Sequence, residues 1–230
     1  MEFRYEREML RPARQWLRSR GLLTRSEFAT PWGVCDLVGC SFRSDSVAKR
    51  RELGQTKAIG SYIHVLVLSQ VPEESEGATV TFDTLRRKLG WSNDESELAR
   101  ILSNLVRRRF LRKNRLGRYQ RLNGWMPLQE AIVALELKLS RFRDALHQAS
   151  AHLEFADESY VGLPMALSRA IANSARAHLL ARLGVGLLGV SRRECEVLIP
   201  PRTHELAGTR PAQVHSVERF WRSYVRGSLA

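Results

Sequence analysis

Length, composition and charge indicate a folded protein with an anionic partner. The chain has 230 residues, 43% of them hydrophobic, which suffices for one mid-sized domain or two small ones and excludes a disordered chain. Its formal net charge of +13 favours nucleic acid over a membrane surface, because the arginines are spread over several predicted elements.

The first predicted element is a helix over residues 5–20. Glu6 falls on one helical stripe with Leu10 and Leu17, so its carboxylate should face the interior. Glu8 is a competing acid, but it aligns with polar positions. An exposed Glu6 that pairs with a neighbouring arginine is an equally good interpretation.

A short apolar strand is expected over residues 32–39, interrupted by one acid, Asp36. Cys35 and Cys40 flank this acid and are interpreted as small buried thiols. Together with Cys195 they make an odd number of cysteines without Cys-x-x-Cys spacing. The sequence therefore predicts neither a zinc site nor a disulfide framework.

The middle of the chain has the pattern of three helices followed by a hairpin. Helices are predicted over residues 56–70 and 81–89 and after a capping box at 92–95, and strands over 110–114 and 118–122. This order resembles a winged helix-turn-helix domain. We expect it as an insertion at residues 47–124.

This inserted region is strongly basic, since residues 107–121 include many Lys and Arg side chains and no acid. The resemblance implies that the third helix enters a major groove and that the hairpin contacts the backbone or the minor groove. A dimerisation or protein-docking module is the alternative, because a charged face is often only solvated. The candidate DNA-binding residues are Arg100, Asn104, Arg107, Arg112, Lys113, Arg115 and Arg118.

An apolar run over residues 131–138 predicts a buried strand that ends in charged residues. Strand side chains alternate, so Glu136 and Lys138 project to one face while the intervening leucine takes the other. If the Asp36 strand is its neighbour, two carboxylates and an ammonium converge. Two close carboxylates repel unless a cation neutralises them, so we expect a hard divalent ion, magnesium, and hydrolytic chemistry on phosphate.

Asp36, followed on a later strand by Glu136-Leu137-Lys138, resembles the signature of the PD-(D/E)XK, or restriction-endonuclease-like, nucleases. The resemblance covers residues 1–46 and about 125–200. It implies an α/β fold with a mixed sheet flanked by helices, built from residues 1–46 and 125–230 around the inserted domain. The implied activity is metal-dependent hydrolysis of DNA phosphodiester bonds.

The resemblance also implies the members of the active site, which are Asp36, Glu136, Lys138, Glu6 and Gln148. Asp36, Glu136 and the carbonyl of Leu137 would bind Mg²⁺, for which Mn²⁺ could substitute. Lys138 would position or activate water, and Glu6 would lie beside the metal or bind a second ion. Gln148, on a helix predicted over residues 140–149, would face the site.

The remaining segments complete the expected α/β domain. They are a strand over residues 158–164, a helix over 165–183, strands over 184–191 and 194–199, and a final helical segment within 203–230. The final segment should pack on the core or on a partner subunit. His147 and His152 are interpreted as ordinary surface histidines.

Other functions compete with the nuclease interpretation. A catalytically inactive nuclease-fold DNA-binding or regulatory protein is disfavoured, because clustered charges are costly to keep without a use. An RNA-directed nuclease stays open, as does a homodimer or a partner subunit. The charged N-terminus and short apolar runs lead us to expect a cytoplasmic protein with no membrane partner.

Overall fold

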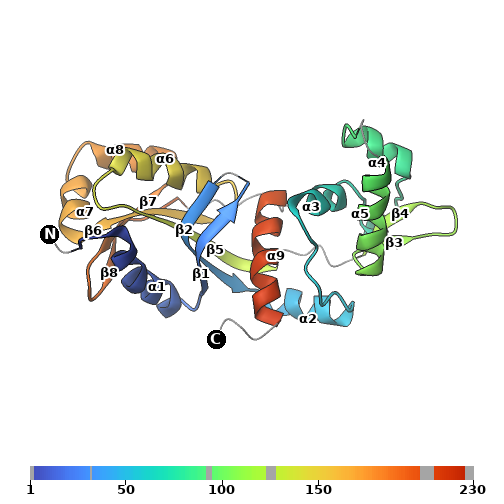
Figure 1. Cartoon of the computed structure of the whole chain (residues 1–230), viewed down its shortest axis with the longest axis horizontal. Coiled ribbons are helices and arrows are strands. Elements are labelled where there is room, and N and C mark those ends of the chain that lie inside the picture. The colour runs from blue at the N-terminus through green and yellow to red at the C-terminus, as the bar shows by residue number, and fades with distance from the viewer. Residues whose placement is uncertain (1–2, 32, 92–94, 123–127, 203–209, 226–230) are drawn as a thin grey trace. The chain divides into compact units, whose positions relative to one another are not determined.

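The structure is a computed structural model that describes residues 3–31, 33–91, 95–122, 128–202 and 210–225 (Figure 1). The chain divides into two compact units. Unit 1 comprises Met1–Ser41, Gln129–Gly208 and Leu229–Ala230, and unit 2 comprises Phe42–Leu128 and Thr209–Ser228. Among the helices described, none has the length and apolar character needed to cross a membrane.

Unit 1 is built on a six-stranded mixed sheet. The parallel strands β5, β6 and β7 form its centre, while β1 pairs antiparallel with β2 and β8 pairs antiparallel with β7. The strands lie in the order β1 (Leu23–Thr30), β2 (Gly33–Phe42), β5 (Gln129–Leu137), β6 (Glu158–Pro164), β7 (Gly186–Val190) and β8 (Cys195–Ile199).

Helices cover both faces of this sheet. The short η1 (Glu6–Met9) and α1 (Leu10–Ser19) pack on one face, where Leu17 shares a core with Leu135. On the other face Ala145 shares a core with Val161. The helices of that second layer are α6 (Phe142–His152), α7 (Met165–Ala172) and α8 (Arg176–Leu183) (Figure 1). The expected α/β class, with a mixed sheet flanked by helices, is confirmed.

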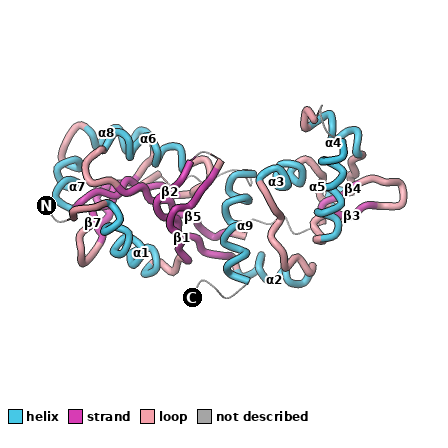
Figure 2. Tube along the Cα trace, viewed as in Figure 1, coloured by secondary structure: helices cyan, strands magenta, loops and turns pink. Residues whose placement is uncertain are grey.

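Unit 2 is mainly helical and carries one two-stranded hairpin (Figure 2). Its elements are α2 (Ser44–Glu52), α3 (Tyr62–Ser69), η2 (Glu74–Glu76), α4 (Phe82–Lys88), α5 (Glu95–Arg107), β3 (Leu111–Lys113), β4 (Tyr119–Arg121) and α9 (Pro211–Val225). Thr81 caps α4 by accepting a hydrogen bond from the Thr84 amide. Apolar residues of α3, α4, α5, the hairpin and α9 share one core.

The structure corrects several expected element boundaries. The helix expected over residues 56–70 begins only at Tyr62, because Gly60 has a φ of +136°, which no helix adopts. The helix expected over residues 165–183 is two helices separated at residues 173–175. Strand β1 and helix α2 were not anticipated, since neither has a clear apolar pattern. The capping box expected at residues 92–95 lies largely outside the described residues.

The division of the chain also differs from the expected one. The units change at Phe42 and at Gln129, rather than after residues 46 and 124. Helix α9, expected to belong to the α/β domain with residues 125–230, is part of unit 2, where Val214 joins the core. The physical reason is that apolar side chains of α9 complete the core around α3. Packing therefore assigns α9 to unit 2, although it follows the strands of unit 1 in the sequence.

A buried ion pair fixes three segments of unit 2 together. Arg50 on α2 pairs with Glu218 on α9, and each side chain is only 2% exposed. A guanidinium nitrogen of Arg50 also donates to the carbonyl of Lys57 at 3.1 Å, and the Ile59 amide donates to Glu218 Oε2 at 2.8 Å. The guanidinium carbon lies 4.6 Å from the ring centre of Trp221. Both charged groups are therefore buried and bonded, apart from Arg50 Nε, which has no hydrogen-bond partner within the described residues.

Glu218→Gln should lower the free energy of unfolding by about 3 kcal/mol, because it leaves the Arg50 charge buried without its counter-ion. Glu52→Gln is the matched control, since Glu52 pairs with Lys49 at 3.0 Å on the exposed face of α2. The control should cost less than about 0.5 kcal/mol. Urea denaturation followed by tryptophan fluorescence measures both, and equal losses in the two variants would contradict the assignment.

Candidate active site

Strands β2 and β5 are neighbours in the sheet, and this pairing brings Asp36 to the charged end of β5. Asp36 Oδ2 accepts a hydrogen bond from the Leu137 amide at 2.8 Å. The Asp36 side chain is 35% exposed, so its carboxylate reaches solvent while it is held against the strand. The main chain of β5 thus fixes the position of this acid.

Glu136 and Lys138 project to the same face of β5 and contact each other. Lys138 Nζ lies 2.5 Å from Glu136 Oε1 and 3.7 Å from Asp36 Oδ2. The Lys138 amide donates to the carbonyl of Gly162 on β6 at 3.0 Å, which anchors the residue just after β5 ends. Lys138 is therefore the shared counter-ion of the two carboxylates.

Glu6 approaches the same place from η1. Its Oε1 accepts a hydrogen bond from the Leu139 amide at 3.3 Å, and its negative charge acts on both Glu136 and Lys138. The side chain is half-buried. Three carboxylates thus surround one ammonium, with Glu6 bonded to the main chain immediately after Lys138.

Burial dominates the electrostatics of this cluster. It raises the pKa of Glu136 to about 7; the hydrogen bond from Lys138 opposes this rise, while the charges of Asp36 and Glu6 add to it. Burial acts to lower the pKa of Lys138, but the hydrogen bond to Glu136 and the nearby negative charges outweigh it and raise the pKa above its ordinary value. Lys138 is therefore charged at neutral pH.

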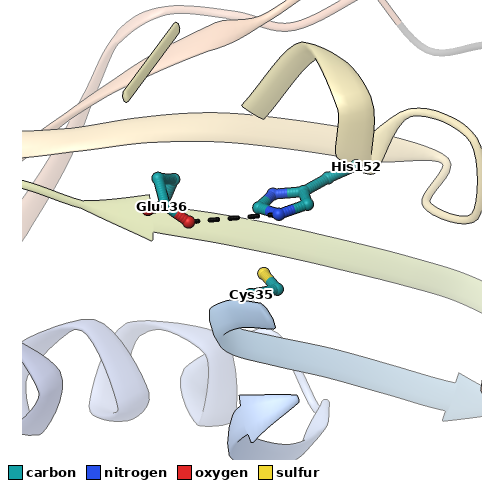
Figure 3. Close-up of side chains that lie close together, drawn as sticks. All are labelled: Cys35, Glu136 and His152. Carbon is teal, nitrogen blue, oxygen red and sulfur yellow. Dashed lines mark ion pairs between the residues drawn. The ribbon is translucent and has the colours of Figure 1, made fainter. Parts of the chain in front are cut away.

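His152, on α6, lies in the cluster, which corrects its interpretation as a surface histidine. It is 4% exposed, and its Nε2 is 4.0 Å from Glu136 Oε2 (Figure 3). Burial, assisted by the charge of Lys138, lowers the pKa of His152 to about 4, so the imidazole is neutral near pH 7. His152 follows Ala149 by three positions, so both side chains lie on the buried face of α6. This helical spacing is visible in the sequence and could have identified His152 as buried.

Cys35 completes a second group of ligand-type atoms with Glu136 and His152. One such atom from each of the three residues lies within 4.8 Å of the others (Figure 3). The Cys35 thiol donates to the carbonyls of Leu37 and Leu135 at 3.5 and 3.4 Å, and burial raises its pKa well above the ordinary value. A protonated thiol is a poor metal ligand, so this trio binds a metal only if the thiol ionises.

The carboxylates offer the better donor set for a hard ion. Glu136 Oε2 is buried and has no hydrogen-bond partner among the described residues, whereas Oε1 bonds to Lys138. A buried carboxylate oxygen without a partner is costly and is free to bind a cation. Asp36, Glu136 and the Leu137 carbonyl fit a magnesium ion in ligand chemistry, although the same carbonyl now accepts from Lys138 Nζ at 3.4 Å.

Gln148 lies on the same helix as His152, one turn before it. It is half-buried and makes no side-chain hydrogen bond to the described part of the chain. His152 Nε2 lies 4.0 Å from Glu136 Oε2, whereas Gln148 makes no hydrogen bond to the cluster within the described residues.

The predicted DNA-binding residues all lie in unit 2. On α5, Arg100 and Arg107 are exposed, whereas Asn104 is half-buried with its Oδ1 enclosed. On the hairpin, Arg112 forms an ion pair with Glu74. Glu73, just before η2, also pairs with Arg121 on the hairpin, so these acids neutralise part of its positive charge.

Comparison with known proteins gives little that bears on function. No family model matches the sequence, and neither does any curated protein. A solved structure described as "SPO1766 protein of unknown function from Silicibacter pomeroyi" is similar over 98% of this chain and 94% of that chain, with 13% identity and a TM-score of 0.42. Its own function is unknown, so the comparison assigns no activity.

The raised pKa of Glu136 predicts a pH-dependent stability difference from the isosteric variant Glu136→Gln. Between the ordinary carboxyl pKa of 4.5 and about 7, folded wild-type protein retains a proton that the unfolded chain loses. The wild-type protein should therefore lose stability relative to Glu136→Gln as pH rises through this window, by about 1–3 kcal/mol. Urea denaturation in chelator at pH 5 and pH 8 measures the difference, and a value independent of pH would contradict the shift.

Proposed function

We propose that this protein is a magnesium-dependent nuclease that hydrolyses DNA phosphodiester bonds. The observation that carries the proposal is the convergence of Asp36, Glu136 and Lys138 where two neighbouring strands meet, with Lys138 Nζ 2.5 Å from one carboxylate and 3.7 Å from the other. The arrangement matches the signature of the PD-(D/E)XK nucleases, in which the acids and the lysine act on one phosphate.

The proposed roles follow from the chemistry of each group. Asp36, Glu136 and the Leu137 carbonyl would hold Mg²⁺ or Mn²⁺. When bound, such an ion supplies Lewis-acid polarisation of the phosphate and lowers the pKa of water. Lys138, charged at neutral pH, donates hydrogen bonds that orient the attacking water and stabilise negative charge developing on the phosphate.

Two further residues would support the reaction. Glu6 accepts from the Leu139 amide, which keeps its carboxylate at the rim of the site, where it can orient water or bind a second ion. Gln148 is half-buried on α6 and would donate from its amide to the water or the phosphate.

Unit 2 would bind the DNA as a winged helix-turn-helix domain. The order α3, α4, α5 and the β3–β4 hairpin supports this assignment, together with the bridge between Val80, just before α4, and Tyr119 on β4. In this arrangement α5 presents Arg100, Asn104 and Arg107 to a groove. The hairpin presents Arg112, Lys113, Arg115 and Arg118 to phosphates or the minor groove.

Asp36→Ala, Glu136→Ala and Lys138→Ala should each reduce magnesium-dependent cleavage of plasmid DNA by about 100-fold or more, because each removes a group that acts on the phosphate. DNA affinity in chelator should change little. Glu154→Ala is the control, since Glu154 is exposed and lies after α6. Cleavage that persists in Glu136→Ala and in excess chelator would refute the metal site, and wild-type protein that binds DNA without cutting it would favour the inactive regulator.

Replacing Arg112, Lys113, Arg115 and Arg118 together with Ala should weaken DNA binding by about 10-fold and flatten its dependence on salt. Arg112→Ala alone should have less effect than Arg115→Ala alone, because Arg112 is partly neutralised by Glu74. Fluorescence anisotropy with a labelled duplex at several salt concentrations measures both. Unchanged affinity and salt slope in the quadruple variant would favour a protein-docking role for the hairpin.

A further inference from the structure

Unit 2 contains a second basic surface that the winged-helix comparison does not explain. A hollow of about 170 Å³ is lined by Gly54, Thr56, Lys57, Arg107, Arg108 and Arg109. A second hollow of about 480 Å³ shares three of these residues and adds Ala58, Arg222 and Val225. We call the two hollows together the basic cleft; its cations are Lys57, Arg107, Arg108, Arg109 and Arg222, and no acid is among the described residues that line it.

The cations of the basic cleft lack counter-ions. Within the described residues, Lys57, Arg107, Arg109 and Arg222 form no ion pair, whereas elsewhere in unit 2 Arg86, Arg112 and Arg121 each pair with a glutamate. The nearby Glu218 is already committed to Arg50. Positive charge that the protein leaves uncompensated in a concave surface attracts an anion from solution.

The walls of the basic cleft are held by main-chain hydrogen bonds. Arg108 Nη1 donates to the carbonyls of Ala58 and Ile59 at 2.7 and 3.1 Å. The buried side chain of Gln55 donates to the Arg109 carbonyl at 2.8 Å. These bonds join the segment before α3 to the end of α5. The cleft is therefore part of the packed unit.

Arg109 lies just after α5, and its side chain lines the cleft beside Gly54. Its φ of +64° is rare for a residue other than glycine. Its side chain lies over Gly54, where an added Cβ would come within 2.7 Å of Arg109 Nη1. This conformation ends α5, because the Arg109 amide donates to the Val106 carbonyl and the Phe110 amide donates to the Leu105 carbonyl, both at 2.9 Å.

The cations also act on one another. Burial lowers the pKa of Arg108, and the positive charges of Arg222 and Arg107 lower it further. A bound anion would remove this repulsion, which adds to the direct attraction between guanidinium and phosphate.

We propose that the basic cleft binds backbone phosphates of a DNA duplex. This inference rests on the proposed nuclease function for the identity of the ligand. Several exposed cations distributed over the two hollows suit successive phosphates of a chain, whereas a single small anion would need them converging on one point. The cleft and the hairpin are then separate phosphate-binding surfaces of unit 2.

The test compares two triple variants that each remove three positive charges. The cleft variant carries Lys57→Gln, Arg109→Gln and Arg222→Gln, all at exposed positions, and glutamine keeps the same backbone strain at position 109 as arginine. The control carries Arg18→Gln, Arg182→Gln and Arg193→Gln, which are exposed on unit 1. Duplex affinity is measured by anisotropy in chelator over a range of salt, after thermal melting shows that both variants fold.

The cleft variant should bind duplex DNA about 10-fold more weakly or worse, and the slope of log affinity against log salt should fall by about 2 to 3, since each lost phosphate contact contributes about 0.9. The control should change affinity by less than about 3-fold. Equal losses in the two variants, or no loss in the cleft variant, would overturn the proposal.

Inorganic phosphate and a mononucleotide are included as competitors to separate the sources of phosphate. Displacement of the duplex by either at millimolar concentration would overturn the proposal in favour of a small-anion site. DNA cleavage by the wild-type protein is measured separately from duplex binding, so failure of the nuclease function can be distinguished from failure of the cleft. Wild-type protein that binds duplex through the cleft but cuts no DNA would refute catalysis and leave the cleft standing.

Discussion

The shared ammonium of Lys138 is the interaction on which the candidate active site depends. Asp36, Glu136 and Glu6 come from three different elements, and their charges would repel one another without a cation between them, most strongly at the buried Glu136. Lys138 supplies that cation at 2.5 Å from Glu136 and 3.7 Å from Asp36. Main-chain amides of Leu137 and Leu139 hold the other two acids, so the peptide backbone of β5 and its end organises the whole cluster.

The two carboxylate oxygens of Glu136 have different surroundings. One of its oxygens bonds to Lys138, while Oε2 faces the neutral imidazole of His152 and the thiol of Cys35 without a hydrogen bond in the described structure. A carboxylate with one satisfied and one unsatisfied oxygen gains most from an incoming cation. A softer ion among Cys35, Glu136 and His152 would require the Cys35 thiol to ionise, and burial opposes that ionisation.

Unit 2 uses its charges in two distinct ways. Arg50 and Glu218 are fully buried and neutralise each other, and their additional bonds to the main chain join α2, α9 and the segment before α3. The charge of Glu218 acts on Arg108 of the basic cleft, but within the described residues the cations of the cleft form no ion pair. Glu218 thus stabilises the fold through Arg50. The positive charges of the basic cleft are the ones that we propose bind a ligand.

The sequence by itself placed Glu136 and Lys138 on a common face, because strand alternation is a local property of the backbone, whereas the α/β class was implied by the resemblance that Asp36 and Glu136-Leu137-Lys138 carry. It also indicated α4, α5 and the β3–β4 hairpin of unit 2, where apolar spacing is regular. Only the tertiary structure decided that β2 lies beside β5 and that α9 belongs to unit 2. It also decided that the buried His152 lies beside Glu136. It also decided which arginines have acidic partners. These outcomes depend on contacts between residues far apart in the chain, which no local periodicity encodes.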